Sequence, residues 1–311
     1  MTTEKTEVKD EWYGEDNFLL VRRDGPIAQV IFSKPERLNA LPMHHTAGVD
    51  EAFTSLSADE NIKVVIFRGE GRAFSTGGDM NWVGTQYTKP AVDENGQPVK
   101  KEKTPQRRML NRDEWHSRGL RSVLNCTKIV IAEGKGYVLG VAMEYFMAAD
   151  IVICSDDCIF GFPPGRMAGV AGNALLWMLR LGPSLSAEMT LMGRYIDAKE
   201  GLERNFINRV VPLAELEDTV NAAAEAICMI PADGLAIGKF ARKMAYTTLG
   251  VDSAALESAM THTLAVQLRI GEHDWNLMNE RMEHGAKGAF KRRDARFQDS
   301  LSRYNPNGPV L

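Results

Sequence analysis

The sequence has few cysteines, no long apolar run and no strong excess of charge, and each absence excludes a class of protein. Four cysteines in 311 residues are too few for a disulfide framework. No histidine lies near Cys154 and Cys158 in the sequence, which argues against a zinc site. The apolar runs are shorter than the roughly 18 residues of a membrane span, and the polar start lacks the apolar core of a signal peptide. The sequence therefore predicts a reduced, soluble, cytoplasmic protein.

The charges are nearly balanced. The chain has 37 basic and 41 acidic residues, a formal net charge of −4. Binding to nucleic acid through bulk electrostatics requires a strongly basic surface, so neither a nucleic-acid nor a membrane partner is expected. A local basic patch for a phosphorylated small molecule remains compatible with this balance.

Short apolar runs bounded by glycine characterise the first two thirds of the chain. Such runs are typical of strands that are covered on both faces of a sheet. We expect buried strands over residues 63–69, 128–132 and 150–154, and a hairpin formed by residues 18–23 and 27–32. From Pro183 onward the apolar spacing is mostly helical. The sequence therefore predicts a mixed α/β core followed by a helical region.

These patterns divide the chain into segments. We expect an N-terminal tail over residues 1–16, a catalytic core over residues 17–212, and a helical oligomerisation region over residues 213–311. Residues 83–113 carry several prolines and a basic run. A connection of this length is typical of an inserted surface loop or of a lid over a site.

The first motif with possible chemistry is Gly71-Arg-Ala-Phe-Ser-Thr-Gly-Gly-Asp79, which follows the expected strand 63–69. Two adjacent glycines allow backbone N–H groups to approach an incoming atom closely. Such N–H groups stabilise an oxyanion that forms from a carbonyl. A tight turn between a strand and a helix would also account for the motif.

The second motif runs from Gly136 to Asp150 and contains Glu144 among Met143, Tyr145 and other apolar side chains. A carboxyl group in apolar surroundings has a raised pKa and suits general acid–base catalysis. Stabilisation of a helix N-terminus is the alternative interpretation of this glutamate.

Together, the two motifs resemble those of the crotonase (enoyl-CoA hydratase/isomerase) superfamily. The segment Lys34-Pro-Glu-Arg-Leu-Asn-Ala-Leu41 and residues 161–172, 191–202 and 289–297 support the resemblance, which covers about residues 17–297. It implies an α/β fold, namely a crotonase-like spiral of ββα units with a helical C-terminal trimerisation region. It also implies a homotrimer or a homohexamer.

The resemblance further implies that the substrate is an acyl-CoA thioester whose enolate is held by two backbone N–H groups. Coenzyme A is then part of the substrate, and neither a covalently bound cofactor nor a metal is expected. The residues that match the family pattern are Gly78 and Val141 for the oxyanion hole, Glu144 as acid/base, Ala40 and Leu41 along coenzyme A, and Arg292 and Arg293 near its phosphates.

One departure from the family concerns Pro164, which stands where a hydratase carries its second glutamate. Proline has no acid–base group, so another residue would have to assist Glu144. His116 is a candidate because histidine exchanges protons near neutral pH. The other candidates, which could assist or line the acyl pocket together with Pro164, are Asp156, Asp157, Trp82 and Tyr145.

Several functions fit these residues. A lyase that hydrates or dehydrates an acyl-CoA would use Glu144 as its main acid/base, and a double-bond isomerase needs only that one base. A hydrolase that cleaves a C–C bond of a β-diketone, or a thioester, would need a histidine such as His116. A catalytically silent acyl-CoA-binding protein is the non-enzymatic alternative.

Overall fold

A seven-stranded sheet forms the centre of the computed structural model, which describes residues 9–42, 44–80, 91–92, 98–99, 105–169, 172–265, 268 and 270–309. Its strand order is β1-β2-β3-β4-β7-β9-β12. The strands are β1 Lys9–Tyr13, β2 Leu19–Asp24, β3 Ile27–Phe32, β4 Val64–Gly69, β7 Ile129–Gly134, β9 Ile151–Ser155 and β12 Arg209–Val211. The expected hairpin and the three expected buried strands are confirmed, each within two residues of its predicted bounds.

The N-terminal edge of this sheet differs from the expectation of a tail over residues 1–16. Residues 9–13 form strand β1, which pairs antiparallel with β2 from Lys9↔Arg23 to Tyr13↔Leu19. Its first three residues are charged, and all of its residues except Tyr13 are exposed. The ladder is reinforced by ion pairs to Arg22 and Arg23 from Asp10 and Glu11. An edge strand of this kind lacks the apolar pattern by which a strand is predicted.

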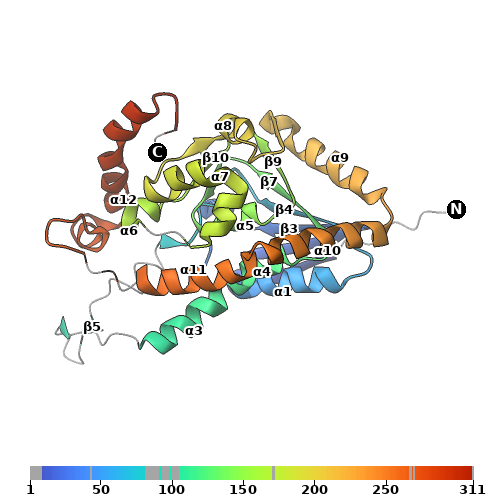
Figure 1. The fold of residues 1–311 in the computed structure, drawn as a ribbon, viewed down its shortest axis with the longest axis horizontal. Helices are drawn as coiled ribbons and strands as arrows, with labels where there is room; N and C mark the ends of the chain where they lie inside the picture. Colours follow the sequence, from blue (N-terminus) through green and yellow to red (C-terminus); the bar gives the residue numbers. More distant parts are fainter. Residues whose placement is uncertain are drawn as a thin grey trace.

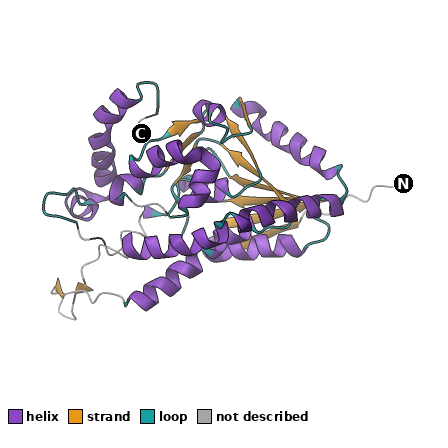
Figure 2. Ribbon diagram, in the orientation of Figure 1, coloured by secondary structure: helices purple, strands orange, loops and turns teal. Residues whose placement is uncertain are grey.

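From β3 onward the strands are parallel and both faces of the sheet are covered. On one face, Val64, Ile66 and Ile131 pack against helix α9 (Leu216–Cys228). On the other face, the main core packs around Phe67, Phe74 and Phe146. Figure 2 shows the strands lying between layers of helices. Because both faces of these strands are buried, their sequences are continuous apolar runs.

Strands β7 and β9 each lead into a second, smaller sheet and then into a helix. Strand β7 is followed by β8 (Tyr137–Leu139) and α5 (Val141–Met147), and β9 is followed by β10 (Ile159–Gly161) and α6 (Gly165–Ala168). Strand β10 pairs with β8 and with β11 (Ile196–Asp197). A bridge between Ser75 and Val138 extends this second sheet to the segment after β4. The chain therefore forms the predicted spiral of ββα units.

Helices cover the remaining surface. Their bounds are α1 His45–Ala58, α3 Gln106–His116, α4 Arg118–Leu124, α7 Ala174–Leu191, α8 Ala198–Glu203, α10 Ala232–Thr248, α11 Val251–Ala265 and α12 Leu277–Tyr304. Helix α3 begins inside the segment predicted as a loop or lid, so residues 106–113 are a correction to that prediction. Helices α10 and α11 cross the front of the molecule, and α12 lies at its left side in Figure 1.

No single helix in the described part of the chain is long and apolar enough to cross a membrane. Only the combination of Leu213–Cys228 with Ala232–Thr248 reaches the required length and composition, and the two helices meet at a bend of 106°.

A buried aspartate fastens helix α3 to helix α11. Asp113 is 3% exposed, and its carboxylate accepts a hydrogen bond from Thr263 at 2.6 Å. It also lies 3.1 Å from the Nδ1 of His262 and forms an ion pair with Arg112 at 3.0 Å. Burial by itself raises the pKa of Asp113, but the hydrogen bonds from His262 and Thr263 outweigh it and hold the pKa below 3.8.

We predict that Asp113→Asn lowers the free energy of unfolding by about 1–3 kcal/mol at pH 7, because it leaves buried donors without their charged acceptor. Since the folded pKa is depressed, the stabilisation by Asp113 is present above the unfolded pKa of 3.8 and is lost as the pH falls below it. Urea unfolding of both proteins from pH 7 to pH 3 measures this. Asp299→Asn, on the exposed part of α12, is the control that should leave stability nearly unchanged. A difference between wild type and Asp113→Asn that does not shrink at low pH would contradict the prediction.

Candidate active site

Glu144 is a buried carboxylate at the start of helix α5, with 9% of its surface exposed. Its Oε2 accepts a hydrogen bond from the side-chain amide of Asn173 at 2.8 Å. Its Oε1 accepts a longer one from the indole N–H of Trp177 at 3.4 Å. No cation forms a salt bridge with Glu144 among the described residues. The carboxylate is therefore held by neutral donors only.

These surroundings raise the pKa of Glu144 from 4.5 to about 7. Burial is the largest cause because it disfavours the charged form. The hydrogen bonds from Asn173 and Trp177 act in the opposite direction, and the negative charge of Glu257 raises the pKa further. A carboxyl group with a pKa near 7 can both donate and accept a proton at neutral pH. The raised pKa of Glu144 agrees with the expectation from its apolar neighbours, and burial is its main cause.

The two donors to Glu144 come from the start of helix α7, which the sequence analysis did not identify. Asn173 precedes the helix with φ +54°, a left-handed conformation that asparagine tolerates better than most residues. Trp177 lies four residues later, on the same side of the helix, and its ring packs against Phe162 at 5.2 Å. The i, i+4 spacing of two side-chain donors at a helix start was the only local signal for this pair.

The two expected oxyanion donors lie on adjacent backbone segments. A Cβ built on Gly77 would lie 2.6 Å from the carbonyl oxygen of Leu139 and 3.3 Å from the Cα of Gly140. Gly78 directly follows Gly77, and Val141 directly follows Gly140. Neither backbone N–H has a hydrogen-bond partner in the described part of the chain. The two segments that carry the predicted donors are therefore in contact, and the oxyanion hole itself stays a prediction.

Ala40 and Leu41 also lie at this point. The N–H of Leu41 donates to the carbonyl of Gly77 at 2.8 Å, and its carbonyl accepts from Asp79 at 2.8 Å. These bonds form an isolated bridge between Leu41 and Gly78. The segment expected to line coenzyme A is therefore joined to the segment expected to hold the oxyanion.

Other predicted residues are placed differently. Tyr145 is 1% exposed and packs in the aromatic core, with its ring 5.8 Å from that of His45. Pro164 precedes helix α6 and is partly exposed. His116 is the last residue of α3. Trp82 lies outside the described residues. The structure thus groups Gly78, Val141, Ala40 and Leu41 around one point, and it leaves the roles of these four residues as predictions.

Arg292 and Arg293 are both bound to carboxylates on helix α12. The Nε of Arg292 donates to Glu280 at 2.6 Å, and Arg292 remains largely exposed. Arg293 is 7% exposed and is paired with Asp294 at 2.8 Å. Their contact with phosphates of coenzyme A stays a prediction, in which Arg292 is the more accessible cation.

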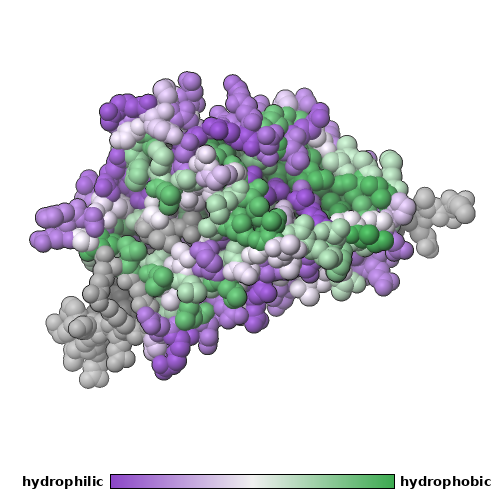
Figure 3. Space-filling model, viewed as in Figure 1, coloured by the Kyte–Doolittle hydropathy of each residue, from purple (hydrophilic) through white to green (hydrophobic). Residues whose placement is uncertain are grey.

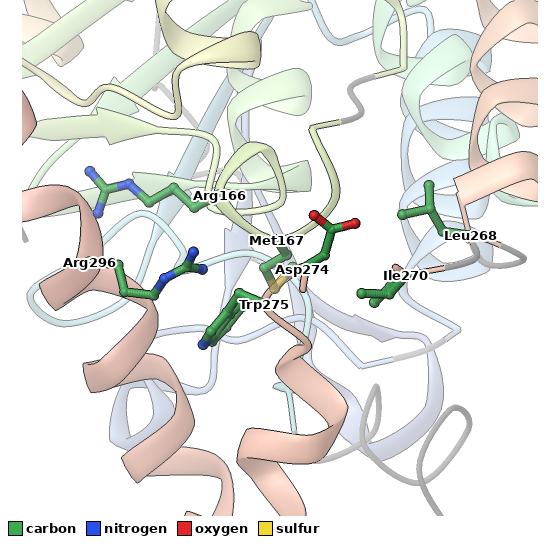
Figure 4. A pocket seen from close by; sticks show the side chains of 7 residues that line it. All are labelled: Arg166, Met167, Leu268, Ile270, Asp274, Trp275 and Arg296. Atoms are coloured by element: carbon green, nitrogen blue, oxygen red, sulfur yellow. The ribbon is translucent and has the colours of Figure 1, made fainter. Parts of the chain in front are cut away.

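A surface pocket of about 220 Å³ lies between α6, α12 and the segment that joins α11 to α12 (Figure 4). It is lined by Arg166, Met167, Leu268, Ile270, Asp274, Trp275 and Arg296. The guanidinium of Arg296 lies 5.1 Å from the centre of the Trp275 ring. None of the predicted site residues lines this pocket. No group of three or more His, Cys, Asp or Glu side chains within the described ranges could hold a metal ion.

The spiral of ββα units, with a parallel-strand sheet and C-terminal helices, defines a crotonase fold. The enoyl-CoA hydratase/isomerase family model matches residues 22–273. The chain belongs to the enoyl-CoA hydratase/isomerase family. This confirms the resemblance that the two motifs carried.

Among curated proteins, the carnitinyl-CoA dehydratases of Salmonella paratyphi A and Salmonella agona are each 28% identical to this chain over 210 residues. The match covers 67% of this chain and 73% of each relative. These proteins are similar to the chain at a level that supports the general class of enzyme.

Solved structures show the same fold. An enoyl-CoA hydratase from Mycobacterium smegmatis superposes with a TM-score of 0.77 at 22% identity, over 89% of this chain and 93% of that one. An enoyl-CoA hydratase/isomerase from Xanthobacter autotrophicus Py2 gives a TM-score of 0.71 at 27% identity, over 90% and 98% of the two chains. The likeness extends over the helical C-terminal region as well as the spiral core.

We predict that Asn173→Gly raises the pKa of Glu144 above 7, because it removes the stronger of the two donors to the charged form. Glycine is chosen because it keeps the positive φ of this position. Trp177→Phe, which removes the longer bond, should raise the pKa less. Infrared titration of the carboxyl band, assigned by its loss in Glu144→Gln, measures both shifts. An unchanged or lower pKa in Asn173→Gly would show that the amide does not stabilise the carboxylate.

Proposed function

We propose that the protein is an enoyl-CoA hydratase/isomerase-like enzyme that acts on an acyl-CoA thioester through an enolate. The observation that supports this most directly is the position of Glu144. It is a buried carboxyl group with a pKa of about 7, in the first turn of the helix whose first N–H belongs to Val141. Such a group is suited to exchange a proton with a carbon next to a carbonyl.

In the proposed mechanism, the thioester oxygen accepts hydrogen bonds from the N–H groups of Gly78 and Val141. Negative charge develops on this oxygen when the α-carbon loses a proton or when a nucleophile adds to the β-carbon. Two fixed donors stabilise that charge, and losing one such donor typically costs about 3–4 kcal/mol of transition-state stabilisation. Glu144 transfers the proton, and Ala40 and Leu41 lie along the coenzyme A part of the substrate.

Two reaction types fit this site. The similarity to carnitinyl-CoA dehydratases supports a lyase that adds or removes water. Isomerisation of a double bond needs only one base, and Pro164 offers no second one at the position where the family carries it. We place the lyase first and keep the isomerase as the second candidate.

We predict that Glu144→Gln lowers turnover of an enoyl-CoA by about 1,000-fold or more, because it removes the group that we propose transfers the proton of the α-carbon. Binding of a non-reactive acyl-CoA should persist, since glutamine preserves the shape of the side chain. Steady-state kinetics and calorimetric titration measure these two quantities. Full activity in this variant would disprove the proposed role of Glu144.

The assembly that we propose is a homotrimer, either alone or paired into a homohexamer. Helix α10 carries a stripe of exposed apolar side chains, with Ile237 71%, Phe240 62% and Met244 57% exposed. Its attachment to the core includes buried Lys239, which pairs with Asp150. Figure 3 shows apolar surface on the face that α10 crosses. A contiguous apolar surface on a stable protein is usually covered by a partner, here by a second copy.

We predict that Phe240→Lys converts the assembly into smaller particles, because it places a charge at the centre of this apolar stripe. Light scattering coupled to gel filtration measures the mass. Leu202→Lys on α8, which is 42% exposed, is the matched control and should leave the mass unchanged. A wild-type protein that is already a monomer would contradict the proposed assembly.

A further inference from the structure

A second carboxylate reaches the surroundings of Glu144 from a part of the chain that the motifs do not cover. Glu257 lies on helix α11, and its Oε2 accepts a hydrogen bond from the backbone N–H of Ala174 at 3.3 Å. Ala174 directly follows Asn173, whose amide donates to Glu144 at 2.8 Å. The two glutamates are thus separated by one short stretch of the start of α7.

The position of α11 at this point is fixed by close packing. A Cβ built on Gly172 would lie 2.1 Å from the hydroxyl oxygen of Ser258, the neighbour of Glu257. Only glycine leaves room for α11 to lie so close to the backbone that leads into Asn173. Further along α11, Asp113 binds His262 and Thr263, so the helix is held at two points that follow Glu257.

The negative charge of Glu257 acts on the carboxyl group of Glu144. This charge raises the pKa of Glu144, which shows that the two carboxyl groups interact electrostatically. The second oxygen of Glu257 accepts a hydrogen bond from Thr261 at 2.6 Å. Glu257 is exposed, and it forms no salt bridge with a cation in the described part of the chain. The carboxylate is therefore accessible to water.

We propose that Glu257 is the second acid/base residue of this site. It supplies the acid/base group that Pro164 cannot provide. This inference rests on the proposed function and names its substrate class as a thioester with a double bond between the α- and β-carbons. Hydration of such a substrate uses two proton transfers, one at water and one at the α-carbon. Helix α11 would supply the group for the first transfer and helix α5 the group for the second.

Hydration begins with a proton transfer from water. The carboxylate of Glu257 takes a proton from water, and the water oxygen forms a bond to the β-carbon. The electron pair of the double bond moves to the α-carbon and the thioester oxygen, where Gly78 and Val141 donate to it. The protonated Glu144 then gives its proton to the α-carbon. The product is a 3-hydroxyacyl thioester, and a proton returns from Glu257 to Glu144 through solvent.

Glu257 also caps the start of α7 through Ala174, so the experiment must separate a structural role from a catalytic one. Glu257→Gln keeps a side-chain oxygen that can accept from Ala174, and it removes the charge and the basicity. A merely structural role would leave hydration in this variant close to wild type. Any residual damage to the site would lower every reaction of Glu144 by a similar factor.

The test compares two reactions of the full-length protein. Hydration of crotonyl-CoA needs both carboxylates, whereas isomerisation of vinylacetyl-CoA to crotonyl-CoA needs Glu144 alone. We expect Glu257→Gln to lower the kcat of hydration by about 100-fold or more, and to change isomerisation by less than about threefold. Glu144→Gln should lose both reactions. Glu225→Gln, on the exposed face of α9, is the control that should retain both.

Several results would overturn the role of Glu257. These are hydration within about threefold of wild type in Glu257→Gln, an equal fall of both reactions, or a wild-type protein that isomerises but does not hydrate. Retention of both reactions by Glu144→Gln would instead refute the proposed function. If the wild type converts neither thioester, infrared titration decides, because removing the charge of Glu257 must lower the pKa of Glu144. An unchanged pKa of Glu144 in that variant would end the proposal.

Discussion

The burial of the Glu144 carboxyl group without a cation is the constraint on which the rest of the site depends. Removing a carboxylate from water costs several kcal/mol unless hydrogen bonds replace its hydration. A cation would hold the group ionised, and no donor at all would hold it protonated. The amide of Asn173 and the indole of Trp177 provide the intermediate case. The resulting pKa of about 7 allows both protonation states at neutral pH.

The fold determines where this group meets the backbone donors. Strands β4 and β7 are neighbours in the large sheet, so the segments that follow them also lie side by side. These two segments are in close contact at Gly77 and Gly140. A larger residue at Gly77 would collide with the carbonyl oxygen of Leu139. The backbone geometry that the chemistry requires is therefore a consequence of strand order together with one glycine.

The parts of the structure that the sequence predicted are those encoded by local patterns. The buried strands β4, β7 and β9 were predictable because apolar runs end at glycines or polar residues. The burial of Glu144 was predictable because apolar residues flank it in the sequence, whereas the roles of Gly78 and Val141 stay predictions. Strand β1 was missed because its pairing with β2 relies on ion pairs, which leave no periodic apolar pattern. Asn173 and Glu257 were missed because they reach Glu144 only through tertiary contacts between α5, α7 and α11.

The tertiary contacts of Glu257 give the C-terminal third of the chain a second place in the structure, beside Glu144. The sequence predicted a helical oligomerisation region there, and the exposed apolar side chains of α10 are consistent with that prediction. Helix α11, however, also packs against the backbone beside Asn173 and brings a negative charge near Glu144. The same helix is clamped to α3 by the buried Asp113. A change that loosens α11 would thus alter the electrostatic surroundings of Glu144 even though it touches no residue of the two motifs. The pKa of Glu144 is therefore coupled to the docking of helix α11, and the surroundings of this carboxyl group extend beyond residue 212.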